Sequence, residues 1–220
     1  MLTLLVLVGG LAVLTLLAPF DTQVELEEAE GPWPYVAVFA LVLGDAVIAI
    51  LPGETTLNTA ATLAAQGKLE LGWVMAAGAL GAVLGDSALY WIANLARPRV
   101  QTRLDALLAN DKVAAAMELI GSTASGLLVF GRYVPGMRFV VNASLGLAGH
   151  PYRDFVRWSA LGGVVWSIYI CAVAYLVGTA LVDSPIAAIA VSAVASSVVV
   201  AIGFVVLARR VRRQRAASAT

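Results

Sequence analysis

Four charged side chains occur at two interruptions of otherwise apolar stretches, and each interruption is marked by a Pro-Gly pair. Asp45 and Glu54 belong to the first interruption, and Arg132 and Arg138 belong to the second. An arginine guanidinium binds phosphate through two parallel hydrogen bonds, and a carboxylate in a medium of low dielectric constant can take up a proton near neutral pH. The residue types therefore predict a site for an anionic substrate that is exchanged against protons.

A purely structural role is the alternative for the same residues. An unpaired charge at the centre of a membrane helix costs about 2.5–3.5 kcal/mol on insertion scales. Pairing two acids with two arginines would remove most of this cost, and the network could serve only to lock the two segments together. Three further polar residues are secondary candidates, with a structural role favoured: Asp86 as a hydrogen-bonding partner of a neighbouring helix, and Asn58 and Asn142 as caps of short helices.

The composition restricts the class of protein in which these charges lie. Of the 220 residues, 60% are hydrophobic and 13% are charged, and the mean hydropathy is +0.89. A soluble domain averages about half apolar and a quarter charged residues, so a soluble enzyme is excluded. The 14 basic and 14 acidic residues cancel and offer no attraction to nucleic acid. One cysteine excludes an intrachain disulfide and a Cys-based metal cluster, and one histidine excludes a His-pair metal motif. Since no Walker loop, nucleophile elbow or catalytic triad occurs either, we expect no metal, no cofactor and no enzymatic activity.

Long apolar stretches predict transmembrane helices, since a helix needs about 20 apolar residues to cross a bilayer. The stretches are residues 2–20, 71–96, 158–182 and 186–208, and only the second contains a charge, Asp86. The first stretch lacks the basic residues that begin a signal peptide, so we interpret it as a retained span. The sequence thus predicts an all-α polytopic membrane protein with about four transmembrane helices.

The distribution of basic residues predicts the orientation, because cytoplasmic segments are enriched in Lys and Arg. Five arginines lie in the tail at 209–220, and three arginines and a lysine lie in the connector at 97–120, whereas residues 21–30 hold five acids and no base. Both termini and the connector are therefore expected to be cytoplasmic. The connector is interpreted either as a helix on the membrane surface or as an ordinary linker.

Two further apolar segments, 35–66 and 122–149, are interrupted by Leu51-Pro52-Gly53 and Val134-Pro135-Gly136. Proline removes a backbone donor and glycine permits unusual backbone angles, so each segment is expected to form two short helices joined by an irregular turn. Given the predicted orientation, the first must enter and leave from outside and the second from the cytoplasm. The sequence therefore predicts one membrane domain, an inverted repeat of 35–96 and 122–182 with two re-entrant hairpins inserted from opposite faces.

Several motifs, in this order, resemble those of the DedA family, also described as SNARE-associated or VTT-domain proteins. They are Leu51-Pro52-Gly53-Glu54, Gly81-Ala82-Val83-Leu84-Gly85-Asp86 and Gly131-Arg132-Tyr133-Val134-Pro135-Gly136-Met137-Arg138. The resemblance extends from about residue 35 to residue 178. There are two departures: Asp45 stands where the family usually has Glu, and residues 142–146 replace a plainer apolar run.

The resemblance implies a protein of the bacterial cytoplasmic membrane that flips undecaprenyl phosphate, or a related polyprenyl phosphate, between leaflets for envelope synthesis. It also implies that Arg132, Arg138, Asp45 and Glu54 are the essential residues. We expect the arginines to hold the phosphate. The acids would pair with the arginines in the empty site and take up protons, or interact with Na⁺, during transport.

Three alternatives stay open at the level of the sequence. The protein could be a phospholipid scramblase, as eukaryotic relatives of the DedA family are. It could be a proton-coupled antiporter of small ions that uses the same acids, or a scaffold that transports nothing. The expected partners are the bilayer and the lipid substrate, with no nucleic acid, and a homo-oligomer is left open.

Overall fold

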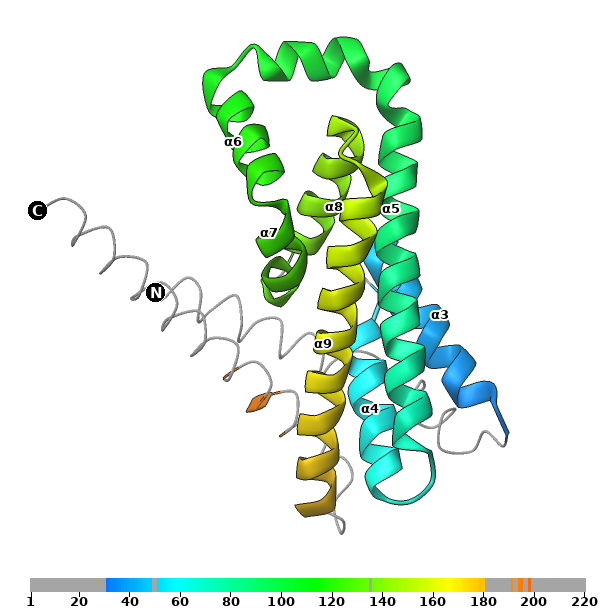
Figure 1. Cartoon of the computed structure of the whole chain (residues 1–220). Helices are drawn as coiled ribbons and strands as arrows, with labels where there is room; N and C mark the ends of the chain where they lie inside the picture. Colours follow the sequence, from blue (N-terminus) through cyan, green and yellow to red (C-terminus); the bar gives the residue numbers. More distant parts are fainter. Residues whose placement is uncertain are drawn as a thin grey trace, which may run out of the picture.

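The computed structural model describes residues 31–48, 51–134 and 136–180, and the single residues 191, 194, 195 and 198. Every secondary-structure element in this part of the chain is a helix, which confirms the predicted all-α class there (Figure 1). In chain order the elements are α3 (Trp33–Val47), α4 (Gly53–Ala65), α5 (Leu71–Leu108), α6 (Asp111–Ser122), α7 (Ala124–Phe130), the 3₁₀ turn η1 (Gly131–Tyr133), α8 (Met137–Ala148) and α9 (Tyr152–Ala180).

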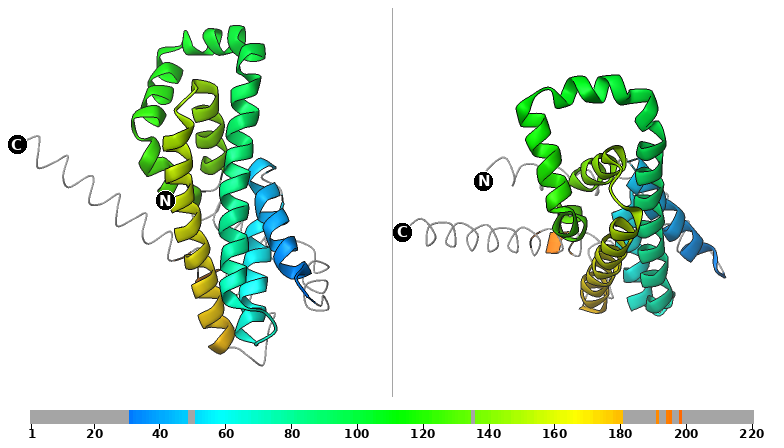
Figure 2. Two further views of the ribbon diagram at one scale, coloured as in Figure 1. Left: turned by 45° about the vertical axis from the view of Figure 1, so that its right-hand side comes forward. Right: turned by 45° about the horizontal axis from the view of Figure 1, so that its top comes forward.

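Within the residues that the structure describes, two helices are long and apolar enough to cross a membrane. α5 meets this condition over Leu71–Arg103 and α9 over Tyr152–Ala180. The two helices lie side by side along the height of the molecule (Figures 1 and 2). They coincide with the predicted spans at 71–96 and 158–182. The other two predicted spans, 2–20 and 186–208, fall outside the continuously described residues.

The helix that contains the second predicted span does not end at residue 96. α5 continues through Pro98 to Leu108, and α6 begins behind Asn110, whose side chain accepts a hydrogen bond from the Lys112 amide at 3.0 Å. This cap satisfies an amide that has no partner within the helix. The predicted connector at 97–120 is thus the end of α5 and most of α6. α6 and the stretch Ala124–Tyr133 meet at 79°, and together they are long and apolar enough for a third span that is bent at Thr123.

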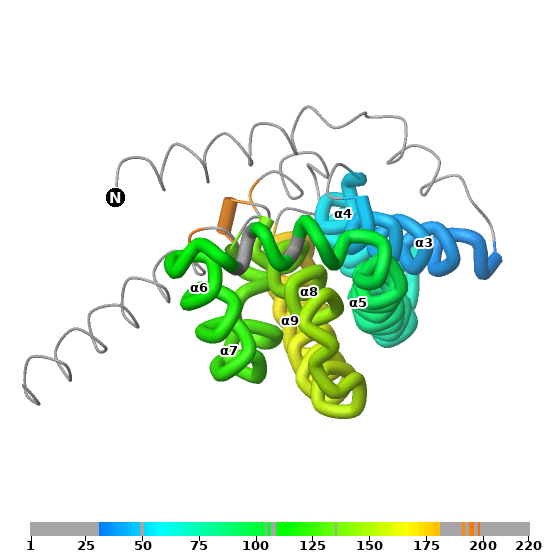
Figure 3. Tube along the Cα trace, turned by 90° about the horizontal axis from the view of Figure 1, so that it is seen from above, coloured from blue at the N-terminus to red at the C-terminus, as the bar shows by residue number. Residues whose placement is uncertain are grey.

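Two pairs of short helices flank opposite halves of the α5–α9 pair. α3 and α4 lie beside the half in which α5 begins, and α7 and α8 lie beside the half in which α9 begins (Figure 1). α3 packs on α5 and α7 on α9, while α4 packs on α9 and α8 on α5. Seen from above, α3 and the α6–α7 pair lie on different sides of the central helices (Figure 3). The second half therefore repeats the contacts of the first half with α5 and α9 exchanged.

Glycines allow the short helices to approach the long helices closely. A Cβ atom built on Gly85 of α5 would lie 2.6 Å from the carbonyl oxygen of Leu43 in α3. A Cβ atom built on Gly162 of α9 would lie 2.7 Å from the carbonyl oxygen of Leu128 in α7. Both distances are too short for a real side chain, so only glycine permits these two backbone contacts.

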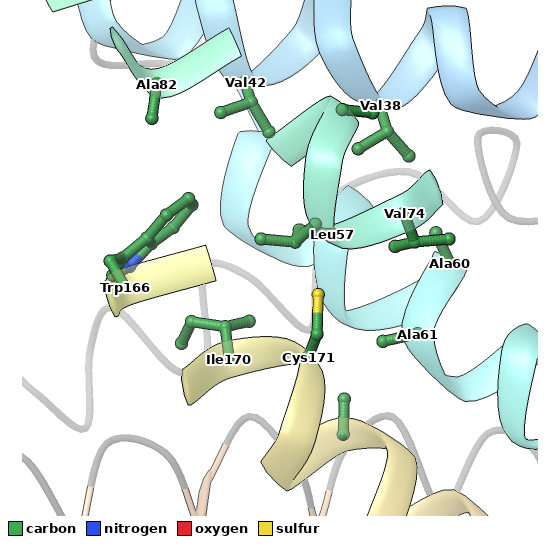
Figure 4. Packing of buried hydrophobic residues seen from close by; sticks show 12 residues of the cluster. Val38, Val42, Leu57, Ala60, Ala61, Val74, Ala82, Trp166, Ile170 and Cys171 are labelled. Atoms are coloured by element: carbon green, nitrogen blue, oxygen red, sulfur yellow. The ribbon is translucent and has the colours of Figure 1, made fainter. Parts of the chain in front are cut away.

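In the described part of the chain, the apolar core has two clusters, and α5 contributes residues to both. In the first cluster, Leu57 of α4 packs among side chains of α3, α5 and α9 that include Val38, Val74 and Cys171 (Figure 4). The second cluster lies between α5, α7, α8 and α9 and consists of Tyr90, Ala124, Leu128, Val141, Leu145 and Phe155. On α5, Asp86 lies between Ala82 of the first cluster and Tyr90 of the second. A carboxylate therefore occupies the junction of two apolar clusters.

Candidate functional site

The carboxylate of Asp86 is fully buried and accepts four hydrogen bonds from side chains. Its Oδ2 atom lies 2.8 Å from Arg132 Nη2 and 2.7 Å from Ser159 Oγ. Its Oδ1 atom lies 2.7 Å from Arg138 Nε and 2.8 Å from Asn142 Nδ2. Two of the donors carry a full positive charge, so the arrangement satisfies both oxygens and compensates the negative charge.

Local backbone features bring these donors to Asp86. Arg132 lies in η1, immediately after α7. Gly136, with φ of 75°, adopts the left-handed conformation that suits glycine and directs the chain into α8. Arg138 and Asn142 are four residues apart in α8, so their side chains share one face of that helix. Ser159 projects from α9, and its residue is completely buried.

Arg132 is the more enclosed of the two arginines. Its side chain is 3% exposed. Besides Asp86, its Nη2 and Nε atoms lie 3.5 Å from the carbonyl oxygens of Ser159 and Leu128. Its Nη1 atom is buried and has no hydrogen-bond partner among the described residues. The guanidinium is thus enclosed by α5, α7 and α9, with one donor unused.

Arg138 lies at the accessible edge of the same network. Its side chain is 15% exposed, and that of its neighbour Asp45 in α3 is 26% exposed. The Nη1 atom of Arg138 lies 3.6 Å from Asp45 Oδ2, which is longer than a hydrogen bond. Its Nη2 atom donates to the carbonyl oxygen of Ala82 at 3.4 Å. An incoming anion would therefore reach Arg138 before Arg132.

Glu54 belongs to the same region but pairs with neither arginine. It lies in the first turn of α4, and within the described residues no Lys or Arg nitrogen comes within 4.0 Å of its carboxylate. The expected pairing of Asp45 and Glu54 with the arginines is thus wrong for Glu54 and holds only at long range for Asp45. The physical reason is that Asp86, approached directly by α7, α8 and α9, takes both guanidinium groups.

The acids of the site outnumber the bases. Asp45, Glu54 and Asp86 face Arg132 and Arg138, so three negative groups and two positive groups give a formal charge of −1. The two-against-two balance expected from the sequence omitted Asp86. A single proton on the unpaired Glu54 would make the whole set neutral.

Neither asparagine caps a helix, so that interpretation is wrong. Asn142 lies inside α8 and donates to Asp86. Asn58 lies inside α4 and is 1% exposed. Its Nδ2 atom donates to the Glu54 carbonyl oxygen at 3.2 Å, and its Oδ1 atom is buried without a partner. Asn58 lies near the middle of α4 and Asn142 near the middle of α8, but the two side chains make different contacts.

Asp86 is central to the site, although the sequence favoured only a structural role for it, and no sequence pattern indicated Ser159. The signal for Asp86 was present, since an ionisable residue within a membrane helix is by default a candidate functional residue. Ser159 gave no comparable signal, because a serine is common in an apolar helix. Among the described residues, no group of three or more His, Cys, Asp or Glu side chains is placed to hold a metal ion.

The central position of Asp86 predicts a large loss of stability when its charge is removed. Asp86→Asn leaves Arg132 buried without an anion and leaves Arg138 only its long contact with Asp45, so we expect a loss of about 3–5 kcal/mol. Ser159→Ala removes one hydrogen bond to the same carboxylate and should cost only about 1.5–3 kcal/mol. Unfolding in detergent can be followed by the reaction of a thiol dye with the buried Cys171. Equal stability of wild type and Asp86→Asn would contradict this assignment.

Comparison with known proteins places the chain in a family. The model of the VTT domain matches residues 51–177, which is more than half of the 220 residues and includes Glu54, Asp86, Arg132 and Arg138. No solved structure gives a significant match.

Three bacterial relatives illustrate the likeness. An uncharacterized membrane protein of Synechocystis sp. is 32% identical over 156 residues, which cover 70% of this chain and 71% of that protein. Protein DedA of Escherichia coli is 24% identical over 164 residues, covering 70% and 74% of the two chains. The inner membrane protein YohD of the same species is 26% identical over 139 residues, covering 63% and 69%. The resemblance seen in the motifs is thus confirmed, and the chain belongs to the VTT-domain family of membrane proteins, the DedA family.

Proposed function

We propose that this protein moves a lipid with a phosphate head group, a polyprenyl phosphate such as undecaprenyl phosphate, across the bacterial inner membrane. The observation that carries the proposal is a buried network of arginines and acids at the middle of an apolar helical bundle, with one edge accessible at Arg138 and Asp45. Charges in such a place are costly, so they are kept where they serve a substrate or an ion. Membership of the DedA family supports a transport role.

Arg138 is the residue that meets the phosphate first. Its contact with Asp45 is long, so a phosphate oxygen can replace that carboxylate at Nη1 at little cost. Its Nε atom stays with Asp86, which holds the guanidinium plane in place. The buried and unused Nη1 atom of Arg132 is a second donor for the same anion. Both arginines are therefore proposed to bind the phosphate, as expected from the sequence, and Arg138 contacts it before Arg132.

The lipid tail remains in the bilayer while the head group enters the site. Large apolar side chains are exposed on both long helices, among them Leu80 and Leu84 of α5 and Leu161 and Ile168 of α9. Such side chains suit contact with acyl or prenyl chains. The chemistry of the head group decides recognition, and the tail needs only an apolar surface beside it.

The α3–α4 and α7–α8 pairs are the re-entrant hairpins of this transporter, inserted from opposite membrane faces as halves of an inverted repeat. The support for this proposal is the exchange of contacts between the two halves and the position of both helix breaks beside the charged network. Irregular backbone at this depth is tolerated only where it lies within protein or lines a hydrated cavity.

Labelling of single cysteines tests this arrangement. In a Cys171→Ala background, Trp33→Cys and Glu70→Cys flank the α3–α4 pair, while Arg103→Cys and Arg153→Cys flank the segment from α6 to α8. A reagent that does not cross membranes should label the first two from one side only and the last two from the other. Trp33 and Glu70 on opposite sides would mean that α3 and α4 cross the membrane together, and the hairpin model would be wrong.

Because Arg138 donates from several nitrogens of its guanidinium group, we expect transport to be impaired by a substitution to lysine, which keeps the charge. Lysine donates from a single point, so it cannot donate to Asp86, as Nε of Arg138 does, and to phosphate, as Nη1 would, in the same fixed geometry. Losing one hydrogen bond to a charged group costs about 1.5–3 kcal/mol, so Arg138→Lys should reduce flipping in liposomes by roughly 10- to 100-fold. Arg132→Lys should also impair flipping and should lower the unfolding temperature as well. Arg157→Lys, at a side chain that is 75% exposed, is the control. Normal flipping in both buried variants would refute phosphate binding by these arginines.

Glu54 has no cation partner among the described residues, so we expect its protonation to make transport depend on pH. When phosphate occupies the arginines, the site gains negative charge, and a proton on an acid compensates it. Glu54→Gln should therefore bind the head group as well as wild type or better, yet flip slowly and without pH dependence. If Asp45 and Glu54 take up the proton jointly, Asp45→Asn should also retain binding and flip slowly without pH dependence.

The measurement is the flipping rate in liposomes between mildly acidic and mildly basic pH, with the exposed Glu118→Gln as control. A wild-type rate that does not change with pH would count against proton coupling. An ion flux that follows the pH gradient, with no movement of phospholipid or polyprenyl phosphate, would favour an ion antiporter. No transport at all would favour a scaffold.

A further inference from the structure

A hydrogen-bond donor and an acceptor lie side by side at the accessible edge of the charged network. The Nη1 atom of Arg138 is 3.6 Å from Oδ2 of Asp45, which is too far for a hydrogen bond. Within the described residues, the other two nitrogens of Arg138 donate elsewhere, and the Asp45 carboxylate accepts no hydrogen bond. Both side chains are partly exposed. A ligand at this edge therefore meets a donor and an acceptor together.

The start of α4 fixes the position of Asp45. A Cβ atom built on Gly53, the first residue of α4, would lie only 2.8 Å from the Cβ atom of Asp45 in α3. The contact leaves no space for a side chain at position 53. The base of the Asp45 side chain is therefore enclosed between α3 and α4, and its carboxylate stays beside Arg138 when a ligand arrives.

Neither of the other two acids is placed to share an arginine donor with a ligand. The oxygens of Asp86 already accept four hydrogen bonds, and its side chain is 1% exposed. Glu54 has no Lys or Arg nitrogen within 4.0 Å among the described residues. The charged groups that act on Asp45 are Arg138 of α8, Asp86 of α5 and Glu54 of α4.

An ionised carboxylate offers only acceptors. A sulfate ester or a phosphodiester also has only acceptor oxygens, so one of them would face Asp45 without a proton between the two groups. A phosphate monoester differs, because its second pKa is about 6 and part of it keeps one P–OH group near neutral pH. In this form one oxygen accepts from Arg138 Nη1, and the hydroxyl donates to Asp45 in a charge-assisted hydrogen bond.

We propose that Asp45 selects lipids with a phosphomonoester head group, because its carboxylate accepts a hydrogen bond from the phosphate hydroxyl while Arg138 binds a neighbouring oxygen. Polyprenyl phosphate and phosphatidate both carry such a head group. Phosphatidylglycerol, a diester, does not, and its oxygens are repelled by Asp45. The selection rests on the proposed function and adds to it a residue that decides between classes of phosphate.

Two esters with the same tail test the selection. Farnesyl phosphate and farnesyl sulfate have heads of similar shape, but only the phosphate carries a hydroxyl near neutral pH. In calorimetric titrations of the full chain in detergent, wild type should bind the phosphate about 10- to 100-fold more tightly, the effect of one hydrogen bond to a charged group. In Asp45→Asn the amide can accept from phosphate or donate to sulfate, so the preference should fall to about threefold or less, chiefly through tighter sulfate binding.

Competition between lipids distinguishes the two sources of a phosphomonoester. Undecaprenyl phosphate and phosphatidate in mixed micelles should each displace farnesyl phosphate from wild type, and the ratio of their affinities measures the contribution of the tail. Phosphatidylglycerol should displace it only from Asp45→Asn. Displacement from wild type by phosphatidylglycerol as strong as that by phosphatidate would overturn selection by Asp45.

The control is Asp154→Asn, at an acid that is 56% exposed beside Arg157 in α9 and should leave the preference for phosphate unchanged. If Asp45 had only a structural role, Asp45→Asn would weaken the binding of both esters and keep their ratio, and this result would overturn the inference. Equal affinities of wild type for the two esters would also overturn it, while the phosphate site would stand. Binding of neither ester nor of undecaprenyl phosphate would reject the proposed function together with the inference.

Discussion

The charge of Asp86 is the constraint on which the rest of the structure depends. A carboxylate at the junction of two apolar clusters is stable only if opposite charges and hydrogen-bond donors surround it. The donors come from η1, α8 and α9, so satisfying one carboxylate fixes three later elements against α5. Gly85 and Gly162 make this possible, since they allow α3 and α7 to approach the long helices at the level of the network.

The two halves of the bundle contribute opposite charges to this network. Asp45, Glu54 and Asp86 come from the first half, and Arg132 and Arg138 come from the second. Neither set is balanced without the other, and the three acids exceed the two arginines by one negative charge. Electrostatic attraction therefore favours the association of the two halves, and one negative charge remains without a compensating arginine.

The proposed function uses the places where compensation is incomplete. Three groups are incompletely compensated within the described part of the chain: Arg138 has a long contact with Asp45, Arg132 has an unused nitrogen, and Glu54 has no cation within 4.0 Å. The tight contacts around Asp86 keep these groups in position.

The sequence by itself determined the helical membrane class, the spans at α5 and α9, the two Pro-Gly breaks and the family. These features follow from composition, hydropathy and local backbone chemistry, which act over short distances along the chain. It also placed Asp45, Glu54, Arg132 and Arg138 near the breaks. Only the tertiary structure decided the partners: Asp86 meets Arg132 across 46 positions and Ser159 across 73. Such contacts depend on how helices pack, and no local pattern distinguished Asp86 from Glu54 as the acid that receives both arginines.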